Sequence, residues 1–417
     1  MTRRSTLASR ILVLAIGALA SSAPALAQGK RYEVLFEARL IPSEKMARAK
    51  IVIGAGAEYM RNLRFRIDPE RHRAFEGDGE VEIQNGGTAL SWTPSGEGAS
   101  LRYVFAIDHL RDERSYDARV TGSWALFRGD DLFPPARVRT VKGARSESRF
   151  RLLAPEGWTR AVPYPLVASG VYDVSHSGRD FDRPTGWMIA GELGAVRERL
   201  GNTHLTVAGP LQHGFRRQDI LAFLRILLPH VEAAAGRLPP RLLVVGASDP
   251  MWRGGLSGTR SLYLHADRPL ISEDGTSPVA HELLHTIMGI SAKDESDWIV
   301  EGLAEFYSLE LLRRSGAMAK ERVDEALADL ERRGRRARSL YTSDARGVVT
   351  ARAVTVLQRL DALIRDRSEG KKSLDDVLRT LVGEREPVTT ERLPEQVEAA
   401  TGLDLASFLR REVGPRP

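Results

Sequence analysis

The chain has 417 residues, a net charge of +6 and no cysteine. Without cysteine there are no disulfides, no thiol nucleophile and no thiolate metal site, so a metal ion would have to bind His, Asp or Glu side chains. Basic and acidic residues alternate along most of the chain, which is typical of a solvated surface, and we expect no nucleic-acid partner.

Residues 1–27 have the layout of a secretory signal peptide. Arginines at positions 3, 4 and 10 precede the apolar run ILVLAIGALASSAPALA, and Ala25 and Ala27 supply the small residues of a cleavage site. A signal anchor is the alternative interpretation. We expect a periplasmic or secreted protein with no stable membrane span after cleavage.

Residues 28–191 predict an antiparallel, β-rich, sandwich-like domain. Segments such as AKIVIGAG, NLRFRID, EVEIQ and LRYVFAID alternate apolar and polar residues, and turn signals such as EGDGE and QNGG separate them. Short strands at this spacing favour a sandwich.

Residues 192–417 follow a different pattern and predict a second domain. THLTVAG and RLLVVGA read as strands on either side of a helical segment, and SLYLHA is a further strand. Helical patterns then dominate, at residues 279–290, 297–315, 320–335, 352–367 and 374–381. The fold class expected for the whole chain is α+β.

The stretch AHELLHTIMGI places two histidines four residues apart on a predicted helix. His281 and His285 therefore share one helix face and can chelate one metal ion, while Glu282 stands beside them as a candidate general base. A core helix that carries two histidines is the alternative. The following helix, DWIVEGLAEFYSLELL, presents Glu301 and Glu305 on one face, which favours a metal site.

These segments resemble the gluzincin metallopeptidases, and more narrowly the glycyl aminopeptidase family, peptidase family M61. The resemblance rests on HELLHT, WIVEGLAEFY, GKKSLDDVLRTL and TGLDLASFLRREV, with GGLSGTRSLYL similar to that family's glycine-rich strand. It implies a mostly helical, thermolysin-like catalytic domain. It also implies one Zn²⁺ per chain and a peptide or protein substrate.

The resemblance assigns the zinc ligands to His281, His285 and Glu301 and the general base to Glu282. Glu305 is the alternative third ligand, and its preferred role is to orient the first histidine. The strand at residues 261–266 corresponds to the sheet edge that pairs with extended substrates in gluzincins. A plain sheet edge with His265 on its surface is the alternative.

The sequence departs from the family pattern at two positions. Ser257 stands where related M1 enzymes have the glutamate that binds a substrate's free amine, which leaves both aminopeptidase and endopeptidase action open. The family's oxyanion-binding tyrosine is replaced at the aligned position, and Tyr341 is the candidate substitute. No PDZ domain of the kind found in many relatives is expected.

The sequence therefore predicts a zinc metallopeptidase with Glu282 as general base. The alternative is a catalytically weak homologue that binds zinc and captures peptides or envelope proteins. Hydrolysis of a non-peptide amide or ester also remains open.

Overall fold

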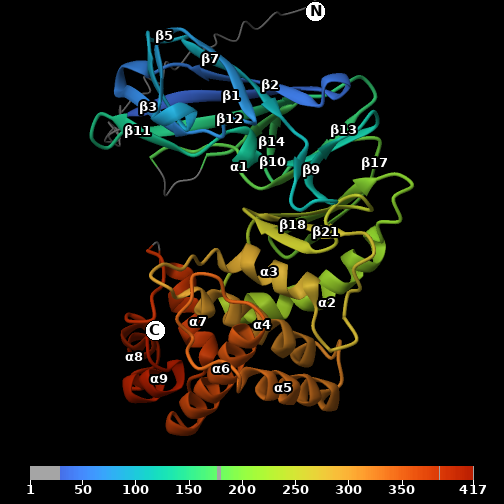
Figure 1. Ribbon diagram of the computed structural model, residues 1–417, viewed down its shortest axis with the longest axis vertical. Coiled ribbons are helices and arrows are strands. Elements are labelled where there is room, and N and C mark those ends of the chain that lie inside the picture. The colour runs from blue at the N-terminus through green and yellow to red at the C-terminus, as the bar shows by residue number, and fades with distance from the viewer. Residues whose placement is uncertain (1–28, 176–179, 385, 417) are drawn as a thin grey trace, which may run out of the picture.

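The computed structural model describes residues 29–175, 180–384 and 386–416. The predicted signal peptide lies outside them. Figure 1 shows three successive layers along the long axis, which are the β-sheets of the amino-terminal part, one further sheet, and the helices of the carboxy-terminal part. No helix among the described residues is long and apolar enough to cross a membrane.

Three sheets form the β-rich amino-terminal part. The seven-stranded sheet has the order β14-β15-β12-β1-β2-β7-β4, the four-stranded sheet β11-β3-β6-β5, and the five-stranded sheet β13-β16-β10-β9-β8. Their strands are β1 Arg31–Ile41, β2 Met46–Ile53, β3 Met60–Arg66, β4 His72–Gly77, β5 Gly79–Gln84, β6 Ala89–Pro94, β7 Ser100–Ala106, β8 His109–Leu110, β9 Tyr116–Val120, β10 Trp124–Arg128, β11 Ala136–Thr140, β12 Arg145–Leu153, β13 Thr159–Ala161, β14 Leu166–Ala168, β15 Val171–Asp173 and β16 Trp187–Gly191.

The expectation of a purely antiparallel first domain is wrong at one strand pair. Strand β1 runs parallel to β12, from Arg31 opposite Arg145 to Arg39 opposite Leu153. Parallel neighbours need a long connection, and here about a hundred residues of intervening strands supply it. The alternating pattern of β1 shows that the strand exists, but it carries no information about the direction of a distant partner.

Strand β16 lies between two apolar cores. Met188 and Ala190 pack into the core of the amino-terminal sheets, while Trp187 and Ile189 point to the opposite face. There they meet residues of the next sheet, including Leu243 and Val245 of β19. All five residues of β16 are buried, so the two parts of the molecule share a continuous apolar interface.

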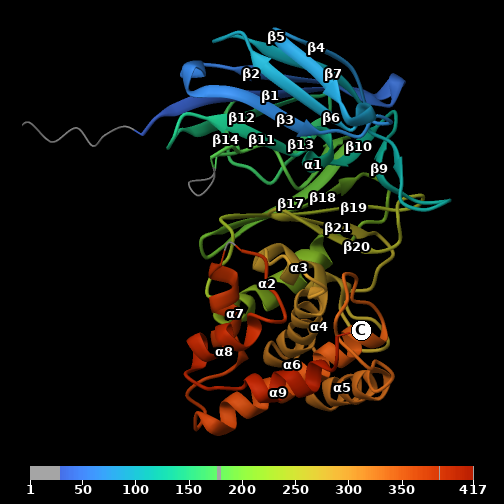
Figure 2. The same cartoon turned by 60° about the vertical axis from the view of Figure 1, so that its left-hand side comes forward.

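The next sheet has the order β17-β18-β19-β21-β20 and lies between the amino-terminal part and the helices (Figures 1 and 2). Its two edge strands are β17 and β20, so the sequence-based assignment of an edge to residues 261–266 is wrong. Strand β21 is enclosed between β19 and β20, and His265 is buried. The strands are β17 Leu193–Leu200, β18 Thr203–Pro210, β19 Arg241–Ala247, β20 Gly255–Gly258 and β21 Ser261–His265.

The five helices predicted by residue range are confirmed, each to within four residues at either end, and the helical segment predicted between β18 and β19 is α2. Two short helices near the carboxy terminus, α8 and α9, were not predicted as helices, and they pack below α7 and α6 (Figure 2). The helices are α1 Gly129–Leu132, α2 Arg217–Ala235, α3 Pro278–Met288, α4 Asp297–Arg314, α5 Lys320–Gly334, α6 Val348–Arg367, α7 Leu374–Gly383, α8 Leu393–Thr401 and α9 Ala406–Val413, with short 3₁₀ turns η1 Pro42–Glu44, η2 Ala57–Tyr59 and η3 Asn85–Gly87.

Helix α4 is the central helix of the carboxy-terminal part, with buried residues around its whole circumference. Gly302 lies where α4 meets α6. A methyl group on Gly302 would come within 2.7 Å of the Cβ of Ala353 and 3.1 Å of Leu357. The glycine therefore sets the close approach of the two helices, because a larger residue has no space.

Replacing Gly302 by alanine should destabilise the protein. The overpacking cost of about 1–3 kcal/mol exceeds the gain of roughly 0.5–1 kcal/mol that alanine brings to a helix interior. Urea denaturation measures the difference. Gly383→Ala is the matched control, because a Cβ there has no neighbour within 4 Å. Equal stability of the two variants would contradict this account of the α4–α6 contact.

Candidate metal centre

Local signals define helix α3, which carries the two histidines. The Ser277 hydroxyl accepts the backbone N–H of Ala280 at 3.1 Å, Pro278 occupies the first helical position, and Gly289 ends the helix in the left-handed region at φ 59°. The same Ser277 hydroxyl donates to the carbonyl of Leu270 at 2.6 Å. The helix ends are therefore fixed on both sides of the histidine pair.

The two imidazoles and one carboxylate of α4 meet at a point. Nε2 of His281 lies 3.0 Å from Nε2 of His285. The Glu301 carboxylate places one oxygen 3.4 Å from Nε2 of His281 and the other 3.3 Å from Nε2 of His285. The structure thus brings together the three residues proposed from sequence as zinc ligands.

This donor set fits a zinc ion. Zinc bonds to nitrogen and oxygen of about 2.0–2.1 Å place neighbouring donors of a tetrahedron roughly 3.3 Å apart. The Nε2–Nε2 separation of 3.0 Å is close to that value, and so are the distances of 3.4 and 3.3 Å from the two different Glu301 oxygens to the two rings. One ligand atom from each of the three residues lies within 4.8 Å of the other two. Three protein ligands also leave one tetrahedral position open, which is the arrangement of catalytic rather than structural zinc sites.

Glu305 lies on the opposite side of the His281 ring. Its carboxylate is 2.8 Å from Nδ1, whereas Glu301 faces Nε2. Glu301 and Glu305 lie one helical turn apart on α4. The Glu301 carboxylate lies among the candidate ligand atoms, whereas the Glu305 carboxylate fixes the tautomer and orientation of the His281 ring. The geometry favours Glu301 as the third ligand and Glu305 as the residue that holds His281.

The site holds a proton tightly in the absence of a metal ion. Burial acts to lower the pKa of His281, but hydrogen bonds with Glu301 and Glu305 outweigh it and raise the pKa above its usual value. Burial acts to raise the pKa of Glu301, but hydrogen bonds with His281 and His285 lower it to about 2. A divalent cation would take the place of that proton.

Glu282 faces the edge strand β20. A Cβ on Gly255 would come within 2.6 Å of the Glu282 Cγ, so the glycine makes room for this side chain. No hydrogen bond to the Glu282 carboxylate occurs among the described residues. The carboxylate is therefore available to a group placed between α3 and β20.

The structure does not bring Tyr341 into this group. Its ring lies under the Arg416 guanidinium, 5.5 Å from the centroid, and lines a cavity with residues of α8 and α9. The cavity that contains His285 is a different one. Tyr341 therefore has no role in the proposed mechanism.

The fold of the chain is similar to that of two solved structures, an aminopeptidase N family protein and an M1 zinc metallopeptidase. An aminopeptidase N family protein from Idiomarina loihiensis superposes with a TM-score of 0.70 at 14% identity, over 92% of this chain and 76% of the other. A mutant of a two-domain M1 zinc metallopeptidase bound to L-tryptophan superposes with a TM-score of 0.59 at 17% identity, over 93% and 94%. No family model and no curated protein sequence matches the chain.

A cavity of about 750 Å³ adjoins the candidate centre. Its lining contains His285 of α3 and Ser257 of β20, together with four arginines from distant parts of the chain. Sequence reasoning missed these arginines, Arg128, Arg183, Arg237 and Arg260. No spacing could have revealed them, because each belongs to a different segment and they meet only after the two parts of the molecule pack together.

In a second group of potential ligands, Asp249, His265 and Asp267, the side chains of Asp249 and His265 are already engaged within the protein. The Arg253 guanidinium donates to both carboxylate oxygens of Asp249. Nδ1 of His265 accepts the backbone N–H of Asp267 at 3.2 Å, so the proton of a neutral ring lies on Nε2, which faces Asp249 at 3.3 Å. We assign no metal to this group.

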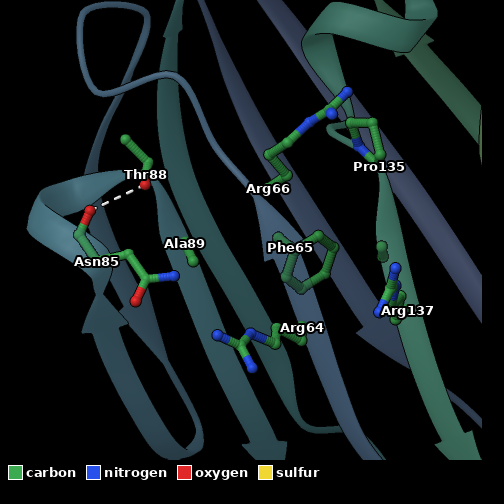
Figure 3. A pocket seen from close by; sticks show the side chains of 9 residues that line it. Arg64, Phe65, Arg66, Asn85, Thr88, Ala89, Pro135 and Arg137 are labelled. Atoms are coloured by element: carbon green, nitrogen blue, oxygen red, sulfur yellow. Dashed lines mark hydrogen bonds between the residues drawn. The ribbon is translucent and has the colours of Figure 1, made fainter.

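The amino-terminal part has a cavity of about 520 Å³ between β3, β6 and β11 (Figure 3). Three arginines, Arg64, Arg66 and Arg137, surround it with Phe65, and the Thr88 hydroxyl donates to the Asn85 carbonyl at 2.9 Å. Its lining contains no histidine and no carboxylate. This cavity therefore has none of the usual protein ligands for zinc.

Substitutions of the two α4 glutamates should separate their roles. Glu301→Gln should abolish stoichiometric zinc binding, because the anionic ligand is lost. Glu305→Gln should retain one zinc per chain with an affinity lowered about 10- to 100-fold, because only the support of His281 is weakened. Competition with a chromogenic chelator measures both affinities. A larger loss in Glu305→Gln than in Glu301→Gln would reverse the assignment.

Proposed function

We propose that the protein is a zinc metallopeptidase in which His281, His285 and Glu301 hold the metal ion. The observation that supports this most directly is the convergence of these three side chains at the separations of a tetrahedral zinc site. The resemblance to the M61 family supports the same proposal from the sequence. The M1-type fold is compatible with it.

Zinc, when bound, acts as a Lewis acid toward a carbonyl oxygen and lowers the pKa of a coordinated water to about 7. Glu282 accepts a proton from the attacking water as its oxygen bonds to the scissile carbonyl carbon. The same carboxylate then delivers this proton to the amide nitrogen, and the carbon–nitrogen bond breaks. The products are a carboxylate and an amine.

Strand β20 offers a place for the substrate backbone. It pairs with β21 on one side only, from Gly255 opposite Leu264 to Gly258 opposite Ser261, and it is the last strand of its sheet. The outward-facing N–H and C=O groups of an edge strand can pair with an extended peptide. Because Glu282 abuts Gly255, a peptide on this edge would pass directly by the general base.

The position of Ser257 bears on where the substrate is cut. Ser257 lines the cavity beside the centre, where related M1 enzymes would present a carboxylate to a free amine. A neutral hydroxyl gives no comparable charge selection for an amino terminus. Cleavage inside a peptide and removal of its first residue both remain compatible with the site.

The decisive variant is Glu282→Gln. It should bind one zinc per chain and lose nearly all turnover, by at least about 10²-fold, because the general base is removed while the ligands stay intact. Mass spectrometry of a defined peptide mixture, free and N-acetylated, measures turnover and locates the cuts. Cuts in both sets indicate an endopeptidase, and loss of single residues from free peptides alone indicates an aminopeptidase.

Two results would count against the proposal. Unchanged turnover in zinc-loaded Glu282→Gln would remove Glu282 from the mechanism. Peptide binding by the zinc-loaded natural protein without any cleavage would instead support the peptide-binding homologue. Mass spectrometry and a binding measurement on the same peptides distinguish these cases.

We also propose that the protein is exported to the periplasm or beyond. The amino-terminal sequence motivates this proposal through its arginines, apolar run and Ala25–Leu26–Ala27 cleavage site. Fractionation of expressing cells, with amino-terminal sequencing of the product, should give a soluble periplasmic or secreted protein that begins at Gln28. Retention of the intact chain in the membrane would indicate a signal anchor.

A further inference from the structure

The cavity beside the candidate centre is enclosed by segments from both parts of the molecule. Gly186 lies so close to the β20–β21 turn that a Cβ would meet the Thr259 carbonyl at 2.3 Å. The backbone N–H of Trp187 donates to the Ser261 hydroxyl at 2.7 Å. Arg128 and Arg183 of the amino-terminal part and Arg260 of the β20–β21 turn therefore line one cavity of about 750 Å³.

Four arginines line this cavity, and they differ in their carboxylate partners. Arg128 and Arg183 both lie near the Asp130 carboxylate, at 3.7 and 3.9 Å. Arg260 and Arg237 have no carboxylate within ion-pair distance among the described residues. Arg260 lies over the Tyr164 ring, and Arg237 donates to the Val382 carbonyl.

The one carboxylate in the cavity lining is already engaged. Glu384 accepts from Gln396 at 2.6 Å and from Arg392 at 3.4 Å, and neither of these partners lines the cavity. It therefore offsets little of the arginine charge. An ammonium group entering the cavity would be repelled, whereas a carboxylate would meet guanidinium groups that can bind it through two parallel hydrogen bonds.

We propose that this cavity is a subsite for acidic side chains of the peptide substrate, with Arg260 as its main specificity residue. Arg260 is the strongest candidate because it lies two residues after β20, shares the cavity lining with Ser257, and has no carboxylate within ion-pair distance in the described part of the chain. The proposal names the substrate class of the metallopeptidase proposed above and rests on that function.

The direction of β20 tells on which side of the cleaved bond the acidic residue lies. The strand runs from Gly255, beside Glu282, toward Gly258 and then Arg260. An extended peptide pairs slightly more favourably in the antiparallel direction, so its residues over Ser257 precede those over Gly255. At about 3.3 Å per residue, the subsite takes the second or third residue before the cleaved bond.

The test compares pairs of peptides that differ only in Glu or Gln at one of these two positions. The zinc-loaded natural protein should cleave the Glu peptide with a kcat/KM at least about tenfold higher, and the preference should shrink as salt is raised. Arg260→Gln should reduce the preference to less than about twofold, and Arg260→Lys should retain part of it. Arg336→Gln, which changes an exposed arginine after α5, should leave the preference unchanged.

A measurement of peptide binding tests the acidic subsite independently of the proposed peptidase activity. Fluorescence anisotropy measures binding of the same labelled peptides to zinc-loaded Glu282→Gln, with and without Arg260→Gln. A Glu preference in binding that depends on Arg260 supports the subsite even if the natural protein cleaves nothing. Equal cleavage and binding of Glu and Gln peptides would overturn it, as would a preference confined to residues after the cleaved bond.

Discussion

The candidate centre depends on three side chains, His281, His285 and Glu301, each of which has a polar atom within 3.4 Å of each of the other two. Two imidazole nitrogens that face each other at 3.0 Å repel unless a proton or a cation lies between them, and Glu301 adds the negative charge that such a cation needs. The surrounding fold resists separation of these groups. Capping fixes α3, and the Trp298 indole N–H at the start of α4 donates to the Thr390 hydroxyl at 2.8 Å.

The sheet between the two parts of the molecule borders the candidate centre and is packed on both faces. One face of the sheet packs through Leu243 and Val245 against β16, and the other packs through Leu242 and Val244 against the helices. Strand β20 is one of the two edges of this sheet, and Glu282 abuts it at Gly255 while Ser257 of the same strand lines the arginine-rich cavity. The proposed chemistry and the proposed specificity therefore both depend on the packing of this sheet.

Much of the centre could be predicted from the sequence because its ligands belong to local patterns. His281 and His285 lie one turn apart, and Glu301 and Glu305 lie one turn apart on the next long helix. Local spacing could not decide between the two glutamates, because both face α3. Only the packing of α4 shows that Glu305 contacts Nδ1 of His281 while Glu301 faces Nε2.

The remaining differences come from long-range contacts. The alternation of apolar residues identified β1 but not its parallel partner. It also identified the strand at residues 261–266, but it did not show that the short strand GLSG pairs with it and forms the edge of the sheet. Tyr341 was proposed on proximity in the sequence, but the chain folds it toward Arg416. The four arginines of the cavity come from segments up to 132 residues apart in the chain, so no window of sequence contains their common surface.

The most direct test of the central claim is a crystal structure of the zinc-loaded protein with anomalous diffraction recorded at the zinc edge. We expect one strong peak per chain, bonded to Nε2 of His281, Nε2 of His285 and a carboxylate oxygen of Glu301 at about 2.0–2.2 Å. A peak bonded to Glu305 in place of Glu301, or a peak only at Asp249 and His265, would contradict that claim.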